Sequence, residues 1–147
     1  MNQLEQICKK YERMSDAERQ TELLKYGMEL VPAMAKHLGG EDKAKAMFRD
    51  FLISAALVDN KLGDTEFDLV NMAVKTTTGQ TLDYAALRRR MIQERRDAQD
   101  VRRSVEQQAK QLSEDLRWGL VYAALIVFSA DHRVGYDELR WLSSIVR

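Results

Sequence analysis

Two stretches of this chain carry the same pattern of residues without a gap, and this repetition constrains the fold more than any other feature. The first, 53–74, reads ISAALVDNKLGDTEFDLVNMAV, and the second, 125–146, reads LIVFSADHRVGYDELRWLSSIV. Asp59 aligns with Asp131, a constant spacing of 72 residues. Within both segments, apolar residues on each side of the aspartate recur at the spacing of an amphipathic helix. The chain therefore predicts two copies of one helix–turn–helix unit.

The composition agrees with a helical fold. Good helix formers dominate, proline occurs once, and hydrophobic residues make up 45% against 31% charged. A length of 147 residues is usual for one domain. We therefore expect a single all-α domain over 1–147, a bundle of about seven helices with two pseudo-symmetric units at about 41–77 and 114–147.

Signals for helix ends divide the N-terminal part of the chain. A short helix is expected at about 2–13. Ser15 and Glu18 have the spacing of a capping box, in which each side chain bonds the backbone N–H of the other residue. They should begin a helix that runs to about residue 37 and is kinked at Pro32, because proline removes a backbone donor.

The C-terminal part is expected to alternate exposed and buried helices. The charged segment 82–110 predicts a partly exposed helix with a break near Arg103. The stretch Trp118–Phe128 is apolar nearly all round, which predicts a buried central helix at about 114–130. A last helix should begin at Tyr136.

The two turns have a purely structural interpretation. If Gly63 and Gly135 are the N-caps, Glu66 and Glu138 take the third helical position. A carboxylate there interacts with the positive helix end and accepts a hydrogen bond from the cap N–H. On this interpretation the turns only start helices.

The same turns also have a cation-binding interpretation. Hard cations such as calcium prefer several oxygen ligands, many of them carboxylates. Asp59, Glu66, Asp131 and Glu138 are the candidate ligands, and they would be pooled if the two units pack with their turns close together. Neither turn has the spacing of an EF-hand. Both interpretations stay open on the sequence.

The Asp-x-x-apolar-x-x-x-Glu turn between two apolar helices resembles the signature of the TerB-like tellurite-resistance domains. It reads DNKLGDTE over 59–66 and DHRVGYDE over 131–138. The resemblance implies an all-helical bundle with internal pseudo-symmetry. It also implies a non-enzymatic role in bacterial resistance to tellurite and other stresses, through the binding of metal ions or partner proteins, some at the membrane.

The chain departs from the family pattern at two positions of each turn. Asn60 and His132 stand where the family has glycine, and Gly63 and Gly135 stand where it has a serine-like cap. A glycine cap offers no side-chain oxygen. This departure weighs against a cation site of the family type.

A basic segment lies between the two units. It holds seven arginines against three acidic residues over 88–103. Six of them are candidate contacts for an anionic ligand or an acidic partner: Arg88, Arg89, Arg95, Arg96, Arg102 and Arg103. The alternative is a solvated helix whose charges pair along one face. No aromatic residues interleave the arginines and the chain has no net charge, so nucleic acid is not an expected partner.

Other function classes find no support in the sequence. A phosphate-binding glycine loop, a nucleophile elbow and a zinc-protease motif are all absent, so we expect no enzyme. Cys8 is the single cysteine, which leaves no intramolecular disulfide. No apolar run is long enough to span a bilayer and the N-terminus lacks a signal-peptide pattern, so we expect a cytoplasmic protein.

The sequence predicts the kind of ligand or partner only in general terms. We expect an unidentified protein partner, and no cofactor other than a calcium-like divalent cation at the turns. Self-association stays open. The competing hypotheses are a structural or oligomerising helical protein that binds no ligand, and an anion or nucleic-acid binder that uses the arginine-rich helix.

Overall fold

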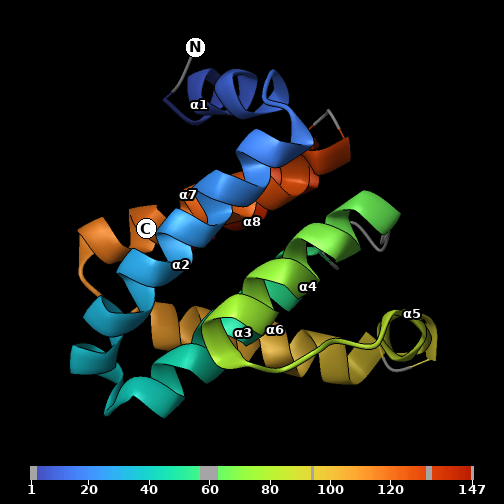
Figure 1. Ribbon diagram of the computed structural model, residues 1–147. Coiled ribbons are helices and arrows are strands. Elements are labelled where there is room, and N and C mark those ends of the chain that lie inside the picture. Colours follow the sequence, from blue (N-terminus) through green and yellow to red (C-terminus); the bar gives the residue numbers. More distant parts are fainter. Residues whose placement is uncertain (1–2, 57–62, 94, 132–133, 147) are drawn as a thin grey trace.

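The computed structural model describes residues 3–56, 63–93, 95–131 and 134–146, and all regular structure in these ranges is helical (Figure 1). The α-helices are α1 Gln3–Glu12, α2 Asp16–Leu38, α3 Glu41–Ala56, α4 Asp64–Thr78, α5 Tyr84–Gln93, α6 Arg95–Ala109, α7 Glu114–Phe128 and α8 Tyr136–Val146, and a 3-10 helix, η1, spans Ser129–Asp131. The expected all-α bundle is confirmed. Segments 57–62 and 132–133, which complete the two turns, lie outside the described residues.

Helix α7 forms the centre of the bundle. It packs against α1, α2, α3, α4 and α8, and Figure 1 shows it behind α2. Every residue from Gly119 to Phe128 is buried except Tyr122, which is partly buried. A helix covered on all sides must be apolar on all sides, as the sequence predicts for this stretch.

Helix α2 runs along the front of the molecule beside α4 (Figure 1). It begins with the predicted capping box: Ser15 Oγ accepts from the Glu18 N–H at 3.2 Å, and Glu18 Oε1 accepts from the Ser15 N–H at 3.2 Å. The helix continues through Pro32, which lies on the exposed face, where water can solvate the carbonyl left without a donor. It ends at Gly39, whose φ of +87° is in the left-handed region.

The expected break near Arg103 is wrong, because α6 runs without interruption from Arg95 to Ala109. Arg103 is exposed, whereas Val105 and Ala109 on the same helix are buried. This apolar face packs against α3 and α8, and that packing keeps the charged helix in place.

Within the described ranges, no helix combines the length and the apolar character that a bilayer crossing requires.

Candidate functional site

The second turn leads from α7 through η1 to α8, and its cap matches the structural interpretation. The Gly135 N–H donates to Glu138 Oε1 at 2.8 Å, and Glu138 is buried. The Val134 N–H donates to Glu12 Oε1 at 3.3 Å, a carboxylate supplied by the end of α1. One glutamate therefore caps the helix locally, and another reaches the turn from the far end of the chain.

The first turn leads into α4 with a glycine and a glutamate at the equivalent positions. Gly63 is the N-cap in extended backbone, and Glu66 is buried in the first turn of the helix. Glu66 Oε1 lies 3.8 Å from the place that a Cβ would take on Gly63, and Glu138 Oε1 lies 3.3 Å from the same place on Gly135. A Cβ at Gly135 would press on the carboxylate, which gives a physical reason for glycine there, whereas a Cβ at Gly63 would make an ordinary contact.

The structure describes the side chains of two of the four candidate cation ligands. Glu66 and Glu138 are both buried beside helix N-termini. Asp131 ends η1, its side chain lies outside the described part, and Asp59 falls in an undescribed segment. The side chains that are described include no group of three or more His, Cys, Asp or Glu arranged to hold a metal ion.

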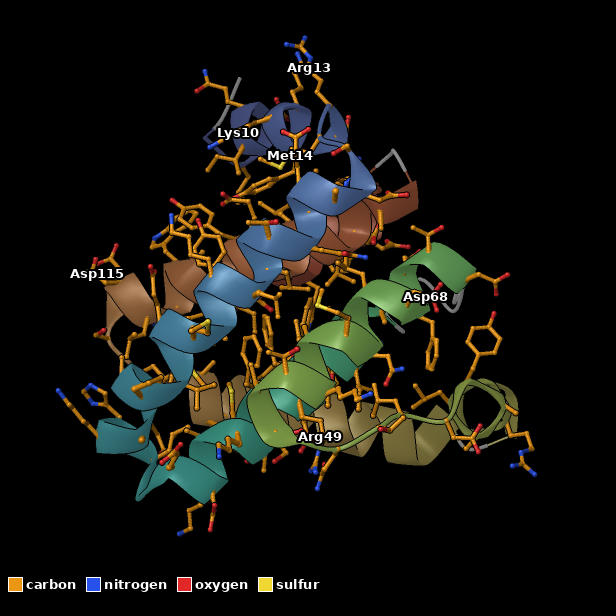
Figure 2. All side chains as sticks on the ribbon, in the orientation of Figure 1. Lys10, Arg13, Met14, Arg49, Asp68 and Asp115 are labelled. Carbon is orange, nitrogen blue, oxygen red and sulfur yellow. The ribbon has the colours of Figure 1, made fainter. Side chains whose placement is uncertain are left out.

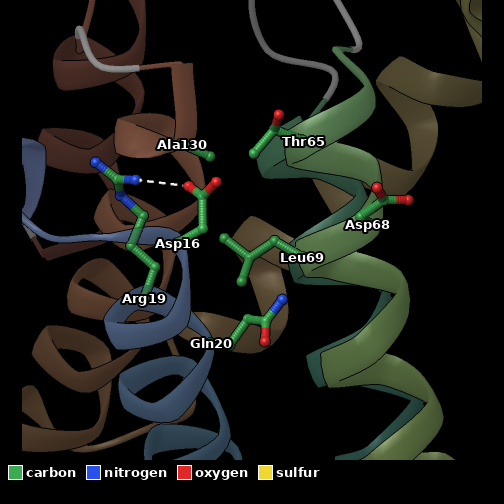
Figure 3. A pocket seen from close by; sticks show the side chains of 7 residues that line it. All are labelled: Asp16, Arg19, Gln20, Thr65, Asp68, Leu69 and Ala130. Atoms are coloured by element: carbon green, nitrogen blue, oxygen red, sulfur yellow. Dashed lines mark hydrogen bonds and ion pairs between the residues drawn. The ribbon is translucent and has the colours of Figure 1, made fainter.

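The first helical turns of α4 and the η1 segment lie against each other, which brings the two repeated units together. A cavity of about 140 Å³ opens beside this contact, between α2 and α4 (Figure 3). Its lining comes from three elements: Asp16, Arg19 and Gln20 of α2, Thr65, Asp68 and Leu69 of α4, and Ala130 of η1. Figure 3 shows Thr65 facing Ala130 across the top of this cavity.

Arg19 lies on the inner wall of the cavity and is only 1% exposed. Its Nη1 donates to Asp16 Oδ1 at 3.0 Å, drawn as the dashed line in Figure 3. Its Nη2 donates to the Glu12 carbonyl at 3.1 Å, and its Nε donates to Ser129 Oγ at 3.3 Å. One guanidinium therefore joins the end of α1, the start of α2 and η1.

The mouth of the cavity is polar and acidic. Gln20, Thr65 and Asp68 are exposed, and Asp68 lies on the outer side of α4 near its N-terminal end (Figure 2). The lining carries two carboxylates, Asp16 and Asp68, against the guanidinium of Arg19. This charge balance favours a cationic group over an anion.

The arginine segment forms a different surface, on α5 and α6. Arg89 and Arg103 are exposed and Arg102 is partly buried. Arg88, Arg95 and Arg96 lie on the same two helices, with side chains outside the described part. None of the six lines the cavity between α2 and α4.

The one thiol lies in α1, packed into the core. Burial raises the pKa of Cys8 from 9.0 to about 11, and the nearby carboxylates of Glu12 and Glu138 act in the same direction. The thiol is therefore protonated at neutral pH, and a protonated thiol is a poor nucleophile.

Sequence reasoning missed Arg19 and Glu12. Arg19 carries a visible signal, since it occupies the buried stripe of α2 with Leu23, Gly27 and Leu30, where a charged residue needs partners. Glu12 carries no such signal, because its partner Val134 lies 122 residues away.

Comparison of the chain with protein-family models, with curated proteins and with solved structures found no match.

Proposed function

We propose that the protein is a non-enzymatic binding module that holds a partner protein at the cavity between α2 and α4. The supporting observation is that the elements carrying the two repeated turns meet there and enclose a polar space lined by Asp16, Arg19 and Asp68. The resemblance of the turn sequences to TerB-like domains supports a role in bacterial stress or tellurite resistance.

The size and charge of the cavity support a single basic side chain as the group that it receives. At about 140 Å³ it is well below the roughly 300–1,000 Å³ of pockets that enclose whole small molecules. A lysine or arginine side chain of a partner would meet Gln20, Thr65 and Asp68 at the mouth of the cavity. Such a contact adds specificity and speeds association, because the opposite charges attract before they touch.

A photo-crosslinking residue tests this proposal in cells. Placed at Thr65 it should form one dominant adduct, whereas at Asp115, an exposed position on α7, it should not. The partner identified in this way should bind the purified protein roughly tenfold more weakly after Asp68→Lys. Equal adducts at both positions, or unchanged affinity of the Asp68→Lys variant, would rule out this cavity as the binding site.

A divalent cation at the turns is the second candidate function. It is favoured by the contact between α4 and η1, which brings an acidic turn of each unit to the same region. Calcium, magnesium, manganese and zinc are added to metal-free protein while the melting temperature is followed. A ligand specific to the native state stabilises it by about 2.7 kcal/mol at a hundredfold excess over Kd.

The matched control is Glu66→Gln combined with Glu138→Gln, which removes both charges and keeps an oxygen acceptor at each cap. A rise in melting temperature that this variant loses would support the cation. No rise with any of the four ions would leave the partner protein as the function to pursue.

A further inference from the structure

The outward face of α2 carries a short apolar strip, formed by the exposed Met28 and the partly buried Leu24. Met28 is 70% exposed and lies on this strip. Together with Leu24 it lines a shallow, mainly apolar hollow that also includes Thr21, Lys25 and Glu29. A methionine this exposed can adapt to the surface of another molecule, because its side chain is unbranched and flexible.

Four exposed charged residues of this face lie at symmetric distances from one position. Glu18 and Lys36 lie equally far on either side of Gly27, and so do Lys25 and Glu29. All four charged side chains are exposed. Lys25, Glu29 and Lys36 have no ion-pair partner among the described residues, so their charges are available to another molecule.

From this order we infer that α2 is the interface of an antiparallel homodimer with its twofold axis at residue 27. In that pairing Lys25 faces Glu29 of the partner subunit, and Glu18 faces Lys36 of the partner subunit. The symmetry repeats each ion pair once, and a parallel pairing would instead place like charges together.

The apolar residues complete the same pairing. Leu24 and Met28 lie one turn apart on one side of the charged row, so the twofold axis brings Met28 close to Leu24 of the partner subunit. The paired stretch from Glu18 to Lys36 is about 27 Å long at 1.5 Å per residue. A single helix pair of this length gives an interface at the lower end of the usual range, so we expect a weak, concentration-dependent dimer.

The interface uses residues of α2 other than Asp16, Arg19 and Gln20, which line the cavity. The inference is therefore independent of the proposed function. Both faces can be occupied in the same molecule.

Charge reversal tests the pairing, because a second reversal should restore the dimer that the first one weakens. Sedimentation velocity from about 1 to 500 µM at low salt should show a monomer–dimer equilibrium for the natural sequence. Lys25→Glu alone and Glu29→Lys alone should each weaken self-association roughly tenfold or more, because each places like charges across the axis. An equimolar mixture of the two variants should form a heterodimer, and the double variant should dimerise again.

Substitution of an exposed apolar residue by glutamate, inside and outside the proposed interface, gives a matched pair of variants. Met28→Glu should abolish the dimer, whereas Tyr136→Glu, at a strongly exposed aromatic position on α8, should leave it intact. Circular dichroism of each variant checks that it folds. A protein that stays monomeric at every concentration, or single reversals that dimerise as well as the natural sequence, would overturn the inference.

Discussion

The two helix–turn–helix units have the same residues at their caps and both pack against α2, but their side-chain bonds reach different parts of the chain. In the second unit, the turn is bound by the N-terminal region: Val134 donates to Glu12, and Ser129 accepts from Arg19. These bonds span 122 and 110 residues. The second unit therefore depends on α1 and the start of α2.

The first unit also packs against α2, and it makes further bonds to the chain that follows it. The Leu82 N–H donates to Asn71 Oδ1 at 2.8 Å, and the rings of Phe67 and Tyr84 meet edge to face at 4.8 Å between centroids. The comparison shows that a capping pattern can be repeated along a sequence, whereas the contacts that fix each copy in the fold are its own.

The largest expected difference between the units is in their first helices, at the aligned positions Leu125 and Ile53. Leu125 is fully buried in α7, whereas Ile53 of α3 is only partly buried. Leu125→Ala should cost about 3 kcal/mol of unfolding free energy, and Ile53→Ala about 1 kcal/mol, because the cost grows with the buried apolar volume that the truncation removes. Urea unfolding measures both. Equal costs at the two positions would contradict the different burial of the two helices.

The next effect should come from Arg19. Arg19→Met keeps much of the volume but removes every donor to the Glu12 carbonyl and Ser129 Oγ. The loss should be about 2 kcal/mol, since buried acceptors are left without a partner. Arg13→Met, at an exposed end of α1 in Figure 2, should change stability by less than about 0.5 kcal/mol. Similar small changes in stability for both variants would show that the hydrogen bonds of the Arg19 guanidinium do not stabilise the fold.

A smaller effect should be common to both units. Glu138→Ala should cost about 1 kcal/mol, because the Gly135 N–H loses its acceptor and the helix start loses a negative charge. Glu66→Ala should cost a similar amount if the cap is a local device. The Gln variant at each position should recover about half of the loss. A cost found at only one of the two positions would show that the surroundings decide the role of this glutamate.

Glu12 should affect the second unit alone. Glu12→Ala removes the acceptor of the Val134 N–H, whereas Glu12→Gln keeps an oxygen there. Amide hydrogen exchange at Val134 should become about tenfold faster in the Ala variant. The Phe67 amide of the first unit, which donates to the Gly63 carbonyl, should exchange as before. Equal acceleration at both amides would mean that the two units open together.

The stability linked to Cys8 should not change with pH near neutrality and should fall in alkali. The pKa of Cys8 is raised to about 11 in the folded protein, so the folded state resists losing this proton. The stability linked to Cys8 is present below pH 9 and is lost as the pH rises towards 11. Unfolding of the natural sequence and of Cys8→Ala, compared from pH 8 to 11, measures it. Parallel profiles for the two proteins would disprove the linkage.

Features set by neighbouring residues could be predicted from the sequence. The capping box at Ser15, the burial of α7 and the bond between Gly135 and Glu138 all follow from spacing over a few residues. The break expected near Arg103 was wrong, because the local charge pattern does not show that Val105 and its helix pack against α3. The TerB-like resemblance and the cation ligands stay predictions.

By itself the sequence determined that the chain is helical, where most of its helices begin, and that a glycine and a glutamate stand at the same places before and in α4 and α8. These follow from backbone hydrogen bonding and apolar periodicity, which act within one or two turns of helix. Only the tertiary structure decided that η1 lies against α4, that Arg19 is buried between them and α1, and that a cavity opens at this junction. The bonds from Arg19 to Ser129 and from Val134 to Glu12 join residues more than a hundred positions apart, so no local pattern in the sequence shows them.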